Sequence, residues 1–186
     1  QKKGPLLAVA DDEEPNRVDL KRLRELKPVF QEDGVLTVGN SPSCNDGAAA
    51  LVVMTEEAAE NLGLTPMARI VGYAGAALAP EWFTIAPVEA ITLALKQTGL
   101  SLGDIDLFEI NEAFSAVSLA INRELGLDPK RVNVNGGAVA LGHPIGATGA
   151  RILTTLLHAM EARDARRGLA GLCIGGGEAL ALIVER

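Results

Sequence analysis

The chain has 186 residues, of which 48% are hydrophobic and only 3% are aromatic. A chain of this length can bury one good-sized core, and the composition is typical of a globular protein packed with small aliphatic side chains rather than of a disordered one. The formal net charge of −7 argues against a nucleic-acid-binding surface and against a polybasic membrane surface, although it leaves room for a local basic patch that binds an anionic ligand.

Neither a membrane span nor a secretory signal is expected. The sequence has no apolar run near the roughly 20 residues that a transmembrane helix needs, and its first residues lack the charged, apolar and small-residue order of a signal peptide. Its two cysteines, Cys44 and Cys173, are too few for a disulfide framework, so a reducing compartment is the simpler expectation. We therefore predict a cytoplasmic protein, with an organelle matrix as the alternative.

The first third of the chain predicts loops, short helices and one strand. An acidic cluster at residues 11–14 precedes a predicted helix whose apolar positions are Leu20, Leu23 and Leu26. Carboxylates suit the positive end of a helix dipole, so metal binding by this cluster is the weaker alternative, and we expect no metal site. Residues 48–54 form an apolar run that is typical of a buried strand, and residues 55–62 look helical.

Strands and helices alternate along the rest of the chain. Apolar runs predict strands at residues 68–77, 105–110, 132–134, 168–174 and 179–184. Helical spacing of apolar residues predicts three helices between them, of which the first two should end at Gly99 and Gly126. The sequence thus predicts an α/β fold with a mixed five-stranded sheet and helices on both faces, because only a short turn joins the last two strands.

The glycine-rich stretch at residues 136–151 carries His143 between a predicted strand and a helix. Its glycines let a ligand approach the main chain, and Pro144 fixes the backbone directly after the histidine. Taken alone, such a histidine is more often an ordinary loop residue than a catalyst. Two further residues favour catalysis, because Asn111 and Cys173 each lie at the end of a predicted strand, where ligands of open α/β sheets gather.

Three motifs in order resemble the C-terminal half of a thiolase, the family that makes or cleaves the carbon–carbon bond of 3-ketoacyl-CoA thioesters. They are Asn-Glu-Ala-Phe at residues 111–114, Gly-His-Pro at 142–144 and Cys-Ile-Gly-Gly-Gly at 173–177. The resemblance implies a thiolase-like layered fold of two similar α/β halves with an inserted loop domain. On that comparison the loop (CoA-binding) domain ends with residues 1–40, the N-terminal half with 41–65, and the C-terminal domain spans 66–186.

The resemblance also implies a role for each site residue. His143 would deprotonate a nucleophilic thiol and, with Asn111 acting through a held water, stabilise negative charge on the thioester oxygen. Cys173 would exchange the α-proton of the acetyl group, which requires a pKa shifted from the free value of about 8.5. The N–H of Gly175 resembles the family's second oxyanion donor. A buried inert thiol is the alternative for Cys173, and a structural carboxylate is the preferred interpretation of Glu112.

The acyl-carrying cysteine of the family belongs to the N-terminal half, and Cys44 is a poor substitute because it lies at the loop-domain junction. Because the chain starts on Gln1 with no initiator methionine, we expect it to be one part of a longer enzyme. The resemblance places the pantetheine arm of CoA against Ser41 and Pro42, with a plain turn as the alternative. Arg17 could meet the CoA phosphates or simply face solvent.

The reaction implied is the joining of two acetyl-CoA molecules into acetoacetyl-CoA, or its reversal. A thiolase acting on longer 3-ketoacyl-CoA chains is the nearest alternative, and a non-catalytic binding subunit of the same fold is the alternative from another class. No permanently bound cofactor is expected, since CoA and acetyl-CoA enter as substrates. The expected partners are the N-terminal thiolase half and further copies of the chain, in a dimer or tetramer.

Overall fold

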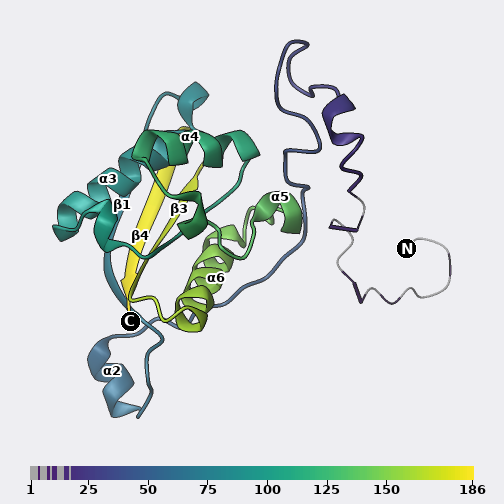
Figure 1. Cartoon of the computed structure of the whole chain (residues 1–186). Coiled ribbons are helices and arrows are strands. Elements are labelled where there is room, and N and C mark those ends of the chain that lie inside the picture. Colours follow the sequence, from purple (N-terminus) through teal and green to yellow (C-terminus); the bar gives the residue numbers. More distant parts are fainter. Residues whose placement is uncertain (1–3, 5–7, 9, 12–14, 17) are drawn as a thin grey trace.

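A four-stranded mixed sheet forms the centre of the protein (Figure 1). The computed structural model describes residues 4, 8, 10–11, 15–16 and 18–186. The strands are β1 (Arg69–Ala77), β2 (Leu107–Ile110), β3 (Arg167–Cys173) and β4 (Glu178–Glu185). The α-helices are α2 (Glu56–Asn61), α3 (Ala86–Thr98), α4 (Ser115–Leu125), α5 (Ala138–Leu141) and α6 (Thr148–Ala162). Short 3-10 turns occur at Leu23–Glu25, Pro80–Trp82, Leu102–Asp104 and Pro129–Arg131.

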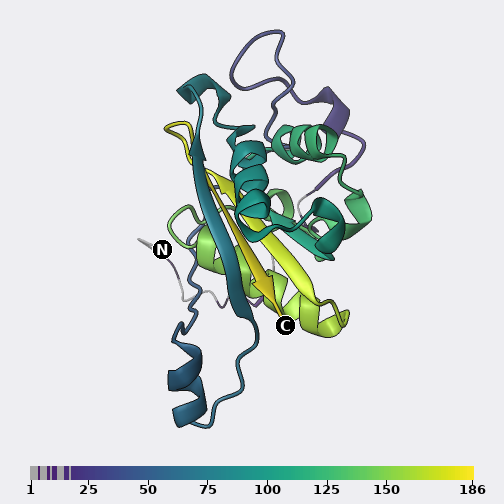
Figure 2. The same ribbon diagram turned by 90° about the vertical axis from the view of Figure 1, so that its left-hand side faces the viewer.

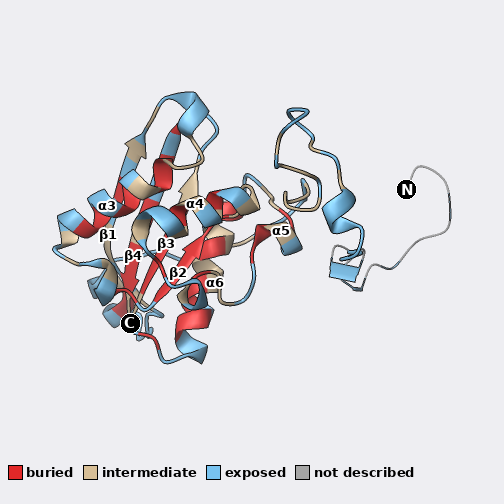
Figure 3. Ribbon diagram, turned by 45° about the horizontal axis from the view of Figure 1, so that its top comes forward, coloured by how far each residue is buried: buried red, intermediate tan, exposed pale blue. Residues whose placement is uncertain are grey.

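The sheet has the strand order β1-β4-β3-β2, in which β2 and β3 are parallel and the other pairs are antiparallel. Helices cover both faces, as the sequence predicts, with α3 packed on one face and α6 on the other (Figures 1 and 2). Each face of the sheet carries its own apolar core. Successive residues of β3 point to opposite faces, so Leu169 belongs to the core under α3 and Ala170 to the core under α6. Buried residues accordingly run along the strands and the inner sides of these helices (Figure 3).

The helix ends follow the sequence signals. Gly99 and Gly126 adopt left-handed φ angles of 70° and 64° and close α3 and α4, which confirms both predicted ends. Pro87 occupies the first turn of α3, where its missing N–H leaves no helical hydrogen bond unmade. None of the described helices is long and apolar enough to cross a bilayer.

The prediction of a fifth strand at residues 132–134 is wrong. Only isolated bridges occur there, Phe108 with Val132 and Val134 with Gly136. The ladder stops because Asn133 takes a left-handed φ of 48°. Its side chain then replaces a strand backbone, accepting from the N–H of Ile110 and donating to the same residue's carbonyl, both at 2.8 Å.

Two predictions for the first third of the chain are also wrong. Residues 48–54 form no strand, and Val52 is 85% exposed, because no described strand lies beside this segment to pair with it. The predicted leucine-bearing helix reduces to the turn at Leu23–Glu25 within the described residues. The helix predicted at residues 55–62 is present as α2, which stands away from the sheet in both views (Figures 1 and 2).

A buried ion pair joins β2 to α6. Glu109 is 2% exposed, and its Oε1 lies 3.1 Å from Nη1 of Arg151. Burial raises the pKa of Glu109 to about 7, although the charge and hydrogen bond of Arg151 oppose the rise and the nearby Glu112 adds to it. Removing Arg151 would leave the Glu109 carboxyl buried without its partner, so the pair adds a polar link to the apolar packing of α6 on the sheet.

We expect Glu109→Gln to flatten the pH dependence of stability. Because the folded pKa of about 7 exceeds the unfolded value of 4.5, Glu109 contributes stability below pH 4.5 that is lost as the pH rises through 7. Across this range, the free energy of unfolding should fall by about 3 kcal/mol more in the wild type than in Glu109→Gln. Urea denaturation at several pH values measures the free energy of unfolding of each protein. Glu124→Gln, an exposed change on α4, should follow the wild type, and identical curves for all three proteins would contradict the expectation.

Candidate active site

Asn111 and Cys173 lie at the same edge of the sheet. Asn111 directly follows β2, and its backbone N–H donates to the carbonyl of Gly171 on the parallel strand β3 at 2.9 Å. Cys173 is the last residue of β3, two positions farther along. The parallel pairing therefore brings both residues to the carboxyl ends of neighbouring strands, where open α/β sheets place ligands.

His143 reaches this edge from the loop between α5 and α6. Gly142 precedes it with a φ of 97°, and a Cβ there would approach Oδ1 of Asn45 to 2.1 Å, so only glycine fits. The N–H of His143 donates to the carbonyl of Ser43 at 3.0 Å. The segment around residues 43–45 thus holds the histidine loop in place.

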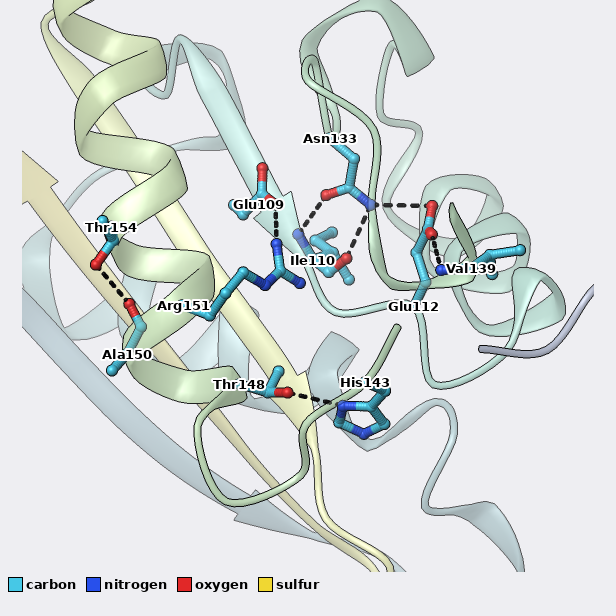
Figure 4. A network of polar contacts seen from close by, with 10 residues as sticks. All are labelled: Glu109, Ile110, Glu112, Asn133, Val139, His143, Thr148, Ala150, Arg151 and Thr154. Atoms are coloured by element: carbon cyan, nitrogen blue, oxygen red, sulfur yellow. Dashed lines mark hydrogen bonds and ion pairs between the residues drawn. The ribbon is translucent and has the colours of Figure 1, made fainter. Parts of the chain in front are cut away.

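The imidazole of His143 has a partner on each ring nitrogen. Its Nδ1 lies 2.7 Å from the Thr148 hydroxyl (Figure 4), and its Nε2 lies 3.5 Å from Nδ2 of Asn111. Asn111 is 1% exposed, yet its Oδ1 has no partner among the described residues. A buried, unpaired amide oxygen is expensive, so this atom is suited to receive a hydrogen bond from a water or ligand.

Burial lowers the pKa of His143 below its ordinary value, and the positive charge of Arg151 lowers it further. The ring is therefore neutral at neutral pH, which is the form that can accept a proton. A neutral imidazole is suited to base catalysis, and once it has accepted a proton it can donate to an oxyanion.

Glu112 and Asn133 connect the asparagine loop to the histidine loop (Figure 4). The carboxylate of Glu112 accepts from the N–H of Val139 on α5 at 2.9 Å and from Nδ2 of Asn133 at 3.5 Å. A Cβ on Gly137 would meet this carboxylate at 2.4 Å, so the loop approaches Glu112 as closely as glycine allows. These contacts agree with the prediction that Glu112 is a structural carboxylate.

Cys173 is a half-buried free thiol, and burial raises its pKa. Residues 174–177 turn the chain into β4, where Gly177 has a φ of 111° and a Cβ would lie 2.3 Å from the carbonyl oxygen of Leu78. Gly175 is exposed within this turn, and its N–H donates to no acceptor in the described part of the chain. The structure thus leaves both a protonated thiol and a free N–H at the end of β3.

A cavity of about 830 Å³ lies beside His143, between the histidine loop and the preceding segment formed by Pro15 and residues 18–44. Ser41, Pro42 and Cys44 line it, while Cys173 does not. The hydroxyl of Ser41 donates to the carbonyl of Thr37 at 2.8 Å, which leaves only its oxygen lone pairs for a ligand. Arg17, predicted to meet phosphate, lies outside the described residues.

The sequence prediction did not include Thr148, Asn133 or the pair of Glu109 and Arg151. Thr148 carried a weak signal, because it lies five residues after His143 at the start of a predicted helix. Asn133 carried none, since a left-handed asparagine cannot be distinguished by its residue type from an ordinary strand position.

Comparison with known families and proteins gives matches along most of the chain. Residues 64–186 match the model of the thiolase C-terminal domain, and residues 1–57 match that of the thiolase N-terminal domain. The acetyl-CoA acetyltransferase of Paracoccus denitrificans is 50% identical over 185 residues, which are 100% of this chain and 47% of that protein. The acetyl-CoA acetyltransferase of Pseudomonas aeruginosa is 54% identical over 187 residues, covering 100% of this chain and 48% of that protein.

Solved structures agree in fold. The Bacillus anthracis acetyl-CoA acetyltransferase superposes with a TM-score of 0.91 at 50% identity, covering 94% of this chain and 44% of that one. Human mitochondrial 3-ketoacyl-CoA thiolase gives a TM-score of 0.86 at 44% identity with the same coverage. The chain spans about half the length of these relatives. With the C-terminal domain match covering most of its residues, the chain belongs to the thiolase family.

Proposed function

We propose that this chain is the C-terminal portion of an acetyl-CoA C-acetyltransferase, which condenses two acetyl-CoA into acetoacetyl-CoA and CoA or catalyses the reverse thiolysis. The observation that carries the proposal is the paired Asn111 and His143 at the strand edge where Cys173 also ends β3. Acyl transfer followed by carbon–carbon bond formation needs a nucleophile, bases and an oxyanion site. This chain offers all of these except the nucleophile.

In the first half-reaction, a cysteine of the N-terminal half attacks the carbonyl of acetyl-CoA. Nε2 of the neutral His143 takes the proton of that cysteine and then passes it to the departing CoA sulfur, so CoA leaves as its thiol. In the second, Cys173 first loses its thiol proton to solvent, and the thiolate then removes an α-proton from another acetyl-CoA. The resulting carbanion attacks the acyl-enzyme carbonyl, a carbon–carbon bond forms, and the cysteine thiolate leaves. In thiolysis the same steps run backward, and the Cys173 thiol protonates the departing enolate.

Charge that develops on the thioester oxygens needs donors held in advance. We assign one oxyanion site to His143, whose Nε2 can donate once it has taken a proton, and to a water held by Asn111, whose buried Oδ1 lacks a described partner. The second is assigned to the N–H of Gly175, which is free in the described part of the chain. CoA is substrate rather than resident cofactor, and no metal takes part in this proposal.

The cavity beside His143 is the proposed path for the pantetheine arm, along Ser41 and Pro42. Its volume of about 830 Å³ lies within the range of small-molecule sites. Leu23, Leu26 and Phe30 give it apolar walls that suit the alkyl parts of pantetheine, and Arg22 also lines it. Arg17 is retained as a proposed phosphate contact.

The proposal also covers the domain boundaries and the oligomeric state. We propose that residues 1–40 end the loop domain, 41–65 end the N-terminal half and 66–186 form the C-terminal domain. The family-model limits at residues 57 and 64 support a boundary in that region. Val52, 85% exposed in a run without a described partner, is expected to pack against the N-terminal half. The whole enzyme is expected to be a cytoplasmic homodimer or homotetramer.

We expect His143→Ala to suppress acylation of the nucleophilic cysteine in the full-length protein. Without the neutral imidazole, no described base is available to take the thiol proton, and the rate should fall by about 10²- to 10⁴-fold. Mass spectrometry after a pulse of acetyl-CoA measures the acetyl increment. His158→Ala, an exposed change on α6, is the matched control and should acylate normally. Undiminished acylation in His143→Ala would remove the assigned base.

Cys173→Ser should affect the other half-reaction. A serine hydroxyl is too weak an acid and base to exchange the α-proton, so deuterium uptake from solvent into bound acetyl groups should collapse. Condensation should fall by about 10²- to 10⁴-fold while formation of the acyl-enzyme survives. Exchange at the wild-type rate would show that Cys173 is only a structural thiol.

A further inference from the structure

The hydroxyl of Thr148 contacts two polar groups at once. Thr148 is 1% exposed and is the first residue of α6. Its Oγ1 lies 3.0 Å from the carbonyl oxygen of Pro144. The same oxygen lies 2.7 Å from Nδ1 of His143, a contact drawn in Figure 4. A threonine hydroxyl has one hydrogen to donate and two lone pairs to accept with. The chemistry of the two neighbours therefore decides in which direction each hydrogen bond runs.

The carbonyl of Pro144 can only accept, so the single hydroxyl hydrogen of Thr148 goes to it. The contact with His143 must then run the other way, from an Nδ1–H to the threonine oxygen. The opposite arrangement would turn the hydroxyl hydrogen toward Nδ1 and set two oxygen lone pairs against each other at 3.0 Å. The ring hydrogen of the neutral histidine is thereby assigned to Nδ1.

The tautomer of His143 also determines which atom of Asn111 faces the ring. With the hydrogen on Nδ1, Nε2 carries a lone pair, and the amide Nδ2 of Asn111 at 3.5 Å is the group that can donate to it. The amide oxygen is then the atom without a described partner. One chain of hydrogen bonds, ending at the Pro144 carbonyl, sets the histidine tautomer and the orientation of the asparagine amide.

We propose that Thr148 is a positioning residue that holds His143 in the Nδ1–H tautomer and thereby makes Nε2 the basic nitrogen. A free imidazole favours the hydrogen on Nε2, so the protein has to impose the other tautomer. Burial and the charge of Arg151 lower the pKa of the ring, which keeps it neutral so that its tautomer matters. The catalytic consequence rests on the proposed function, whereas the tautomer itself does not.

Other threonines show that the backbone bond alone does not explain the arrangement. Thr154, on the same helix, donates to the carbonyl of Ala150 at 2.9 Å, and Thr92 on α3 donates to the carbonyl of Val88 at 2.8 Å. Such bonds to the preceding turn are ordinary for helical threonine. Thr148 differs because its oxygen also meets a ring nitrogen, and Thr154 supplies a matched control (Figure 4).

The first test is the tautomer of His143 in the full-length wild-type protein. Long-range proton–nitrogen NMR correlations at neutral pH distinguish a protonated ring nitrogen from a bare one. We expect Nδ1 of His143 to carry the hydrogen. The NMR signals of the exposed His158 can be identified because they disappear in His158→Gln. A ring hydrogen on Nε2 of His143 in the wild type would overturn the proposal, whatever the variants do.

The second test compares Thr148→Val, Thr148→Ser and Thr154→Val. Valine keeps the shape without an acceptor, so His143 should shift toward the Nε2–H tautomer and kcat should fall by about 10- to 100-fold, as when a partner orienting a functional histidine is removed. KM for acetyl-CoA should not change, because Thr148 does not line the cavity. Serine should restore both readouts, and Thr154→Val should match the wild type.

An unchanged tautomer in folded Thr148→Val would overturn the proposal, as would an equal kcat loss in Thr154→Val. If Thr148→Val fails to fold, the wild-type spectrum and the Thr148→Ser kinetics still decide. An Nδ1–H tautomer in a protein without acetyl transfer would support this inference while refuting the proposed function, so the two fail separately.

Discussion

The parallel register of β2 against β3 is the constraint on which the site depends. Glu109 and Asn111 are two residues apart, so the pleat turns both toward the face that α6 covers. There Glu109 meets Arg151 and Asn111 meets His143. A slip of one residue would turn both side chains to the α3 face and break the ion pair together with the imidazole contact. The register is held strongly because β2 is buried along its whole length.

The loops beyond the strand ends are fixed by polar side chains rather than by a ladder. An edge strand leaves backbone groups unpaired, and at Ile110 both are satisfied by the side chain of Asn133. Asn133 also meets Glu112, which accepts from Val139 beside the histidine loop. Each link satisfies a partly buried polar group, so displacing one would leave its partner without that hydrogen bond. These side-chain hydrogen bonds position the site loops where no strand ladder does so.

The sequence predicts those features that depend on residue type and period. Helices closed by Gly99 and Gly126, and strands that deliver Asn111 and Cys173, follow from such signals. Features that depend on partners distant in the sequence cannot be predicted in this way. The apolar run at residues 48–54 has the composition of a strand but no described neighbour to pair with. The predicted fifth strand is absent because Asn133 has a left-handed backbone conformation. Asparagine tolerates this conformation, but its presence in a sequence does not predict it.

Burial acts on the two titrating groups of the proposed mechanism in opposite directions and for one reason. It lowers the pKa of His143 and raises that of Cys173, because each neutral form is favoured away from water. A neutral imidazole is a base and a neutral thiol is an acid, so the resting site holds one of each. That pairing suits thiolysis, in which Cys173 protonates the enolate. Condensation instead needs the Cys173 thiolate, which desolvation disfavours. The thiol must therefore give up its proton before it can take the α-proton of the second acetyl-CoA.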